Sequence, residues 1–181
     1  ASGAPEIFVL DPTFNADPAR ALDLLGLFRR RAPRLRWRFE IRAELLNRAQ
    51  ARAFALLDCS VQIGLQSARP EVLAGIGRPG FDPQRFARQL RLLDEEGVRF
   101  GLDLIYGLPG DDLSGFRSSL DYALGLGPNH LDVFPLAVLP GTELADRAVE
   151  LGLEVEPGAP HLLRSAPGWS REELAAAGGL A

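Results

Sequence analysis

The stretch that decides the fold is residues 98–127, VRFGLDLIYGLPGDDLSGFRSSLDYALGLG, which predicts one strand–turn–helix unit. Its first part, 98–106, has the length of a strand and largely alternates apolar residues with polar residues or glycine. Two glycines and a proline then shape a tight turn within YGLPGD. Asp111 or Asp112 is suited to cap the helix that follows, which ends near Gly127. A strand joined to a helix in this way is the repeating unit of a parallel α/β sheet.

The same unit recurs along the chain. Helix starts of a similar kind are Asp17 with Pro18, Asp82 with Pro83, and Thr142. Strands that alternate with helices predict an α/β fold: a partial (β/α) TIM-like barrel, with a parallel sheet of five or so strands and helices on its outer face. Five units cannot close an eight-stranded barrel. The five strand-sized runs are 6–11, 36–42, 61–67, 98–106 and 130–136.

The predicted domains are the partial barrel over residues 1–152 and a C-terminal tail over 153–181. The tail begins with a segment rich in proline and glycine, and Ser170 with Glu173 forms a capping box for a short final helix. We expect this tail to pack on the outside of the sheet.

Composition limits the class of protein. The 181 residues are 46% hydrophobic and 24% charged, which excludes a disordered or collagen-like chain. The apolar runs are far shorter than the roughly 20 residues of a membrane-spanning helix, so we expect no membrane partner. No apolar signal region or arginine-rich leader opens the sequence, and a cytoplasmic location is expected. The single cysteine excludes a disulfide framework and an iron–sulfur cluster held by this chain's thiolates alone.

The net charge of −4 argues against nucleic acid as an obligatory partner. One segment, Arg29 to Arg42, nevertheless holds seven arginines. Either these form a solvated helix end, which we favour, or they contact a polyanion such as RNA.

Three of the predicted strands have one apolar and one polar face. In 36–42, for example, aromatic and aliphatic residues alternate with arginine and glutamate. Parallel sheets covered on both sides are apolar on both faces, so helices are expected on one side only. We expect the polar face to line a concavity that holds a ligand. The alternative is that this face is the solvated face of a two-layer sandwich. Gly64 and Gly101 on the polar face favour a ligand, because glycine lets it approach the backbone.

Ligands of parallel α/β sheets lie at the carboxyl ends of the strands. Asp11, at the first of these ends, is suited to accept from an amine or hydroxyl, or it belongs to an ordinary helix-entry turn. Glu40 and Arg42 either pair with each other inside the lumen or meet a zwitterionic ligand. Gln66 and Ser67 suit a ribose diol, although Ser67 could instead cap the short helix that starts at Pro70.

Two loops complete the candidate site. Arg78, in a Gly-Arg-Pro-Gly loop, is placed to clamp a carboxylate with two hydrogen bonds, or it is solvated. The YGLPGD loop has a backbone that could flank a flat aromatic ring, with Ile105 packing against the ring. Cys59 is expected to be buried filler, and neither His130 nor His161 has a partner at metal-ligand spacing, so no metal ligand is predicted.

Five segments in register resemble the radical S-adenosylmethionine (radical SAM) superfamily. The likeness is greatest to its iron–sulfur oxidoreductases and methylthio- or methyltransferases, many of which carry a cobalamin-binding domain. The segments, within about residues 5–152, are EIFVLDPTFNAD, WRFEIRAELL, VQIGLQSARPEVLAGIGRPG, LDLIYGLPGDDLSGFRSSLDYAL and LDVFPLAVLPGTELADRA, which match the second to sixth strands of the family's barrel.

The resemblance implies S-adenosylmethionine (SAM) as cofactor. It also implies a 4Fe–4S cluster, whose C-x-x-x-C-x-x-C ligands are expected in an N-terminal segment outside this sequence, and cobalamin through a further domain. The implied activity is generation of a 5′-deoxyadenosyl radical for hydrogen abstraction or group transfer by the complete enzyme, with this part alone expected to be inactive.

The resemblance also assigns roles to single residues. The loop from Asp11 to Phe14, with Asp11 and Thr13 as its site residues, would lie at the position that holds the SAM amino group. Gln66 and Ser67 would contact ribose, with Gln66 where the family often has glutamate. Arg78 would meet the SAM carboxylate. The remaining positions are Ile105, Gly107 and Pro109, which would flank adenine, and Glu40 and Arg42, which would line the cavity floor.

Two other functions stay open at this point. One is a non-catalytic barrel that acts as a binding or scaffold module. The other is an unrelated βα enzyme that uses the Glu40 and Asp103 carboxylates for acid–base work. The substrate, a small molecule or a tRNA, is not identified. The open sheet edge at 6–11 predicts a homodimer.

Overall fold

The computed structural model describes residues 4–11 and 13–180. Five strands form one sheet in the order β1-β2-β3-β4-β5, and β1–β2 and β2–β3 pair in parallel. The predicted α/β fold with a parallel five-stranded sheet and flanking helices is therefore confirmed. The strands are β1 (Glu6–Val9), β2 (Arg36–Ile41), β3 (Cys59–Gln66), β4 (Arg99–Tyr106) and β5 (His130–Pro135).

The chain divides into two compact units, which are described one at a time. The first comprises residues 1–64, 82–102 and 126–131, and the second comprises 65–81, 103–125 and 132–181. The first unit holds 14 arginines and 11 acidic residues, so its formal charge is +3. The second unit holds 6 arginines and 13 acidic residues, so its formal charge is −7, and the two charges sum to −4. The excess positive charge is therefore confined to the first unit. The predicted boundary at residue 152 stays a prediction.

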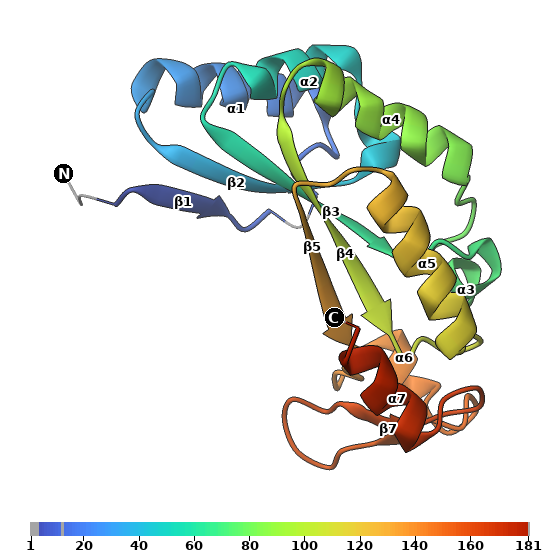
Figure 1. Cartoon of the computed structure of the whole chain (residues 1–181). Helices are drawn as coiled ribbons and strands as arrows, with labels where there is room; N and C mark the ends of the chain where they lie inside the picture. The colour runs from blue at the N-terminus through green and yellow to red at the C-terminus, as the bar shows by residue number, and fades with distance from the viewer. Residues whose placement is uncertain (1–3, 12, 181) are drawn as a thin grey trace. The chain divides into compact units, whose positions relative to one another are not determined.

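In the first unit, helices α1 (Pro18–Arg31), α2 (Arg48–Ala55) and α4 (Pro83–Glu95) lie along one side of β2 and β3 (Figure 1). Their contacts with the sheet are aromatic. The Phe28 ring of α1 stacks on Trp37 with centroids 4.2 Å apart, and Phe54 of α2 lies 5.3 Å from Phe39. A short 3₁₀ helix, η1 (Ala43–Leu45), follows β2.

The helix starts in this unit follow from side chains that cap the backbone. Asp17 and Asp82 each accept hydrogen bonds from two backbone N–H groups of the first turn, and a proline occupies the first helical position, as predicted. Helix α2 was not predicted, although Asn47 and Gln50 form a capping box in which each side chain accepts from the other's backbone N–H. The signal was therefore present as Asn-x-x-Gln.

The second unit contains four helices and a small two-stranded sheet. Helix α6, opened by Thr142 as predicted, ends at Asp146, because the Ala148 N–H donates to the Ala145 carbonyl three residues back instead of continuing the α-helical pattern. The predicted capping box of Ser170 and Glu173 is confirmed. The elements are α3 (Pro70–Gly75), α5 (Leu113–Gly125), α6 (Glu143–Asp146), α7 (Arg171–Gly178), β6 (Glu154–Val155) and β7 (Leu163–Ser165).

The core of the second unit draws on the tail. Leu163 of β7 is buried with Leu108, Leu136 and two valines in one apolar cluster. Trp169 is also buried, and its Nε1–H donates to the Leu108 carbonyl at 3.1 Å. The tail thus packs on the loop that follows β4. No helix in the described part of the chain is long and apolar enough to cross a membrane.

The two-faced character of the strands is confirmed for β2, where three apolar residues are buried and the alternating charged residues are exposed. The interpretation of Gly101 is corrected. A Cβ at this position would lie 2.1 Å from His130 Nε2 and 2.4 Å from Gln62 Oε1, and these two atoms are themselves 2.6 Å apart. The close approach that glycine permits is therefore made by the chain's own side chains.

Candidate functional site

The first-unit candidates are engaged with their own neighbours. The half-buried Asp11 carboxylate lies 2.8 Å from Arg20 Nη1, in the first turn of α1, and this pair fits the helix-entry alternative. Thr13 is half-buried in the turn between them. The loop is tied to the end of β2 by Asn15, a buried residue to which sequence reasoning gave no role. Its side chain exchanges two hydrogen bonds, of 2.9 and 3.0 Å, with the backbone of Arg42.

Of the two alternatives for Glu40 and Arg42, an ion pair between them is wrong, and a contact with a ligand stays a prediction. Arg42 lies one residue beyond β2, where the chain turns into η1, and its Nε donates instead to Glu44 Oε1 at 2.8 Å. Glu40 is exposed on the polar face of β2, and its carbonyl accepts from Phe14 N–H at 2.9 Å. Glu40 thus presents its carboxylate on this face.

In the second unit, the end of β3 has an unusual geometry at Gln66. The Ser67 N–H donates to the Leu65 carbonyl at 2.9 Å, which closes a three-residue turn with Gln66 in its centre. The φ angle of Gln66 is +67°, in the left-handed region that is strained for a residue other than glycine. Its Oε1 atom is buried and has no hydrogen-bond partner among the described residues, a condition shared only with Trp37 Nε1 and Gln50 Nε2. Of the three, only Gln66 lies at the carboxyl end of a strand.

Ser67 is buried and serves the turn itself. Its Oγ accepts from the backbone N–H of Arg69 at 3.1 Å and lies 3.3 Å from Ser119 Oγ of α5. Ser119 also accepts from the Ala68 N–H at 3.0 Å. The alternative in which Ser67 caps α3 is wrong, because Arg69 is the N-cap of this helix and no side chain caps it. A ribose contact of Ser67 stays a prediction.

Arg78 is half-buried in the loop after α3, and its backbone N–H donates to the Leu73 carbonyl at 2.8 Å. Gly77 and Gly80 on either side have φ angles of +78° and +81°, so the loop depends on glycine. The predicted contact of Arg78 with a carboxylate is neither supported nor contradicted by this geometry.

One side of the YGLPGD loop is covered by the tail. Gly107 has a φ of +90°, and a Cβ there would lie 3.0 Å from Leu163 and 3.3 Å from both Leu136 and Leu174. Ile105 is partly buried against the same leucine-rich cluster, and Pro109 is buried. A flat ring beside this loop therefore has to lie on the side away from these leucines.

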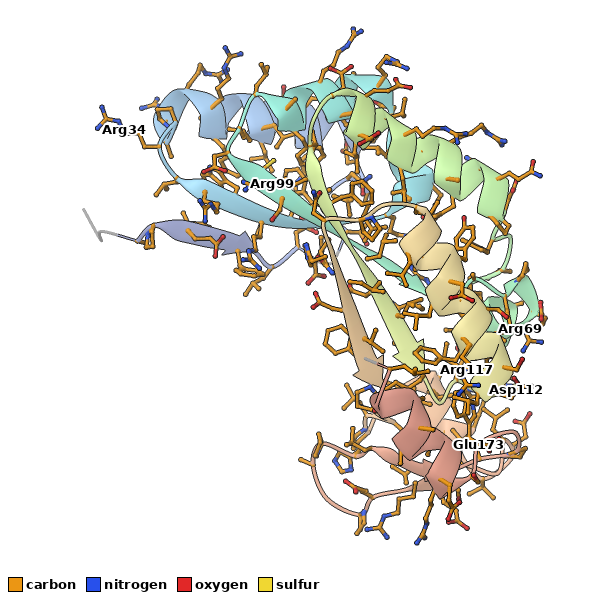
Figure 2. The ribbon with its side chains drawn as sticks, viewed as in Figure 1. Arg34, Arg69, Arg99, Asp112, Arg117 and Glu173 are labelled. Atoms are coloured by element: carbon orange, nitrogen blue, oxygen red, sulfur yellow. The ribbon has the colours of Figure 1, made fainter. Side chains whose placement is uncertain are left out.

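A buried ion pair lies at the end of this loop, and sequence reasoning missed it. Asp111, with a side chain only 1% exposed, accepts from Arg69 Nη1 at 2.9 Å and from the Asp112 N–H at 3.0 Å. Burial raises the pKa of the Asp111 carboxyl, and the two hydrogen bonds oppose that rise. In Figure 2, Arg69 lies beside the first part of α5. Asp111 was predicted only as a helix cap.

A shallow cavity of about 570 Å³ lies near the starts of α5 and α7. Asp112 and Glu173, labelled in Figure 2, line it, but both carboxylates cap backbone N–H groups, of Gly115 and Ser170 respectively. None of the predicted site residues lines this cavity.

The described residues do not fit an iron–sulfur cluster or another metal. No group of three or more histidine, cysteine or acidic side chains is arranged to hold an ion within residues 4–11 and 13–180. Cys59 is buried and donates to the Phe54 carbonyl, and burial raises its pKa to about 12. No step through a metal is therefore derived for this chain.

Comparisons with known proteins agree with one another. No family model matches the chain. The heme chaperone HemW of Mycobacterium tuberculosis is 36% identical over 87 residues, which are 48% of this chain and 22% of HemW. The chain thus spans about a fifth of the length of this curated relative.

Two solved structures share the fold. The radical SAM methyltransferase TsrM of Kitasatospora setae, solved with cobalamin and a [4Fe–4S] cluster, aligns with a TM-score of 0.70 at 23% identity, over 87% of this chain and 34% of TsrM. Coproporphyrinogen III oxidase (HemN) of Escherichia coli, a radical SAM enzyme, aligns with a TM-score of 0.61 at 25% identity, over 71% of this chain and 31% of HemN. The predicted resemblance of this chain to the radical SAM superfamily is therefore confirmed, over part of the length of each relative.

Proposed function

We propose that this chain binds SAM at the ends of β3 and β4 in the second unit, as part of a radical SAM enzyme. The observation that carries the proposal is Gln66, whose backbone is held at a positive φ and whose buried amide oxygen has no partner among the described residues. The family resemblance implies that Gln66 would contact the ribose of SAM, which supports the proposal.

The energetics of Gln66 favour a ligand. An unpaired buried acceptor costs about 1–3 kcal/mol, and a residue held in a sparsely populated backbone region costs about 1–3 kcal/mol more. Strain of this kind persists where the surroundings impose it, and it concentrates at ligand sites. A ribose hydroxyl that donates to Gln66 Oε1 would remove the first cost. The side-chain amide also supplies an N–H donor, which a glutamate at this position would lack.

The remaining roles are proposals of the same kind. We propose that Arg78 meets the SAM carboxylate, and that adenine lies beside Ile105, Gly107 and Pro109 on the side of the loop away from Leu163. For the whole protein, we propose that a 4Fe–4S cluster would supply one electron to the SAM sulfonium, so that the C5′–S bond breaks to give methionine and a 5′-deoxyadenosyl radical for hydrogen abstraction or group transfer. A scaffold without catalysis is the alternative, and it predicts no SAM binding.

The test uses a substitution that separates binding from stability. Glycine adopts a positive φ without strain, so Gln66→Gly should keep the turn and leave the unfolding midpoint unchanged or higher. We expect the same variant to weaken SAM binding about tenfold, because the amide contact is lost. Gln84→Ala, on the exposed surface of α4, is the matched control and should bind as the wild type does. Titration calorimetry with SAM measures the three proteins, and equal affinity of Gln66→Gly and wild type would overturn the role of Gln66.

A further inference from the structure

The ion pair of Arg69 and Asp111 lies where the two loops of the proposed SAM site meet. Arg69 follows the Gln66 turn by three residues, and Asp111 ends the YGLPGD loop. The pair is therefore a direct link, of 2.9 Å between Nη1 and Oδ1, between the loop after β3 and the loop after β4.

Arg69 contacts the Gln66 turn through its backbone and Asp111 through its side chain. Its backbone N–H donates to Ser67 Oγ, and Ser67 in turn contacts Ser119 of α5. Its guanidinium reaches Asp111 through Nη1 and the exposed Glu71 through Nε, at 2.7 Å. A displacement of Asp111 would thus move Arg69, whose backbone N–H holds Ser67 in place.

Two glycines make room for the pair. A Cβ on Gly115, in the first turn of α5, would lie 2.1 Å from Asp111 Oδ1 and 2.3 Å from Arg69 Nη1. A Cβ on Gly168, in the tail, would lie 2.5 Å from the Asp111 carbonyl oxygen. The Asp111 carboxylate thus lies between the β3–α3 loop and the start of α5, and the backbone of the same residue lies against the tail.

Stability alone is a weak reason for such a pair. The Asp111 carboxylate loses its hydration and the one-third exposed Arg69 guanidinium loses part of it, and apolar residues of similar volume often stabilise a protein as well as, or better than, a pair of this kind. The ion pair, unlike a pair of apolar side chains, is a directional contact that joins one particular atom in each of the two loops. Sites that bind a cofactor need supporting contacts of this kind, because small displacements of the binding groups reduce affinity.

We infer that Asp111 is a positioning residue for SAM, which through Arg69 holds the Gln66–Ser67 turn in register with the YGLPGD loop. The inference rests on the proposed function for its consequence in binding, but its structural part is measurable without SAM.

The experiment compares three variants of this chain. Asp111→Asn keeps the shape of the side chain and removes its charge. Glu71→Gln is the matched control, because it removes the charge of the other, exposed partner of Arg69. The double variant R69M/D111L replaces the pair by apolar residues, so its unfolding midpoint should remain near or above that of the wild type even if binding is lost.

Two measurements are made on each variant. In hydrogen exchange followed by NMR, we expect the Ser67 amide to exchange at least about fivefold faster in Asp111→Asn and in R69M/D111L, and at the wild-type rate in Glu71→Gln. In calorimetry, we expect SAM affinity to fall about tenfold in the first two and to be unchanged in the third.

The outcomes separate the two proposals. Faster exchange at Ser67 with no SAM binding by the wild type would leave the positioning link standing and overturn the proposed function. Unchanged exchange at Ser67 in Asp111→Asn would overturn the inference. The inference would also be overturned if SAM affinity were lost in Asp111→Asn but kept in the stable R69M/D111L. SAM binding would then not require the ion pair between Arg69 and Asp111.

Discussion

Replacing Gly115 by alanine adds one methyl group at the most crowded point of the second unit. The new Cβ would lie 2.1 Å from Asp111 Oδ1 and 2.3 Å from Arg69 Nη1, far inside van der Waals contact. Asp111 cannot move away freely, because its side chain is 1% exposed and its carbonyl contacts Gly168. The methyl group therefore has to break the ion pair or displace the start of α5.

Two opposing effects determine the change in the free energy of unfolding of Gly115→Ala: the broken ion pair lowers it, and the better helix propensity of alanine raises it. Breaking a buried ion pair costs about 3–5 kcal/mol, and the cost here lies at the lower end because Arg69 is one-third exposed and can turn toward water. Alanine in place of glycine in a helix gains up to about 1 kcal/mol. We therefore expect Gly115→Ala to lower the free energy of unfolding by about 2–3 kcal/mol.

The same helix supplies the control. Gly125, the last residue of α5, has open space within 4 Å of the point where alanine would place its methyl group, so Gly125→Ala should range from neutral to about 1 kcal/mol more stable. Urea unfolding followed by the fluorescence of the buried Trp169 measures both variants. If Gly115→Ala lies within about 0.5 kcal/mol of Gly125→Ala, the enclosure of the Arg69–Asp111 pair is not as described.

Three further predictions concern the first unit and the ends of its helices. Cys59, whose pKa burial raises to about 12, should resist a thiol reagent at pH 8 in the folded chain and react at once in urea, and rapid labelling of the folded chain would contradict its burial. Backbone N–H groups of Arg85 and Gln84 hold the pKa of Asp82 below its usual 3.8, so its stabilising effect is full above pH 3.8 and is lost as the pH falls below that value. The difference in thermal midpoint between the wild type and Asp82→Ala should accordingly shrink in acid, and a gap that does not change with pH would count against the cap. The arginines in the last turn of α1 and in the turn after it are exposed and form no ion pair within the described part of the chain; they are Arg29, Arg30, Arg31 and Arg34. As a solvated helix end, they should bind no RNA at 150 mM salt. RNA binding whose logarithm of affinity falls with the logarithm of salt concentration at a slope of about −3 would instead support a polyanion contact.

The regular elements could be predicted because their signals are local. Asp17 and Asp82, each followed by proline, identify helix starts by chemistry within one turn. Alternation in 36–42 identifies the two faces of β2. The end of α6 has no such signal, because it depends on the Ala148 N–H donating to the Ala145 carbonyl, and residue types alone do not specify that choice.

The candidate site was harder, because its geometry depends on residues distant in sequence. Arg69 and Asp111 are 42 positions apart, and neither belongs to a pattern that indicates a pair. The tail was expected outside the sheet, yet Leu163 and Trp169 pack against the YGLPGD loop, since only the folded chain brings them together. Conversely, Arg42 turned from its expected partner to Glu44 because β2 ends one residue earlier. Gln66 was chosen from its place at a strand end, but its positive φ has no sequence signal.

The prediction of a homodimer through the strand at 6–11 remains a prediction. Strand β1 does lie at an edge of the sheet, where it pairs only with β2, and Phe8 is 56% exposed. Those are the features that edge pairing requires.

An NMR titration of the ¹⁵N-labelled chain with SAM at millimolar concentration shows directly whether the ends of β3 and β4 bind this cofactor. We expect saturable shifts at the backbone and side-chain amides of Gln66, at Ser67 and at Gly107. We expect none in the cavity lined by Asp112 and Glu173. Shifts confined to that cavity, or no shifts at all, would contradict the claim that the ends of β3 and β4 form a SAM site.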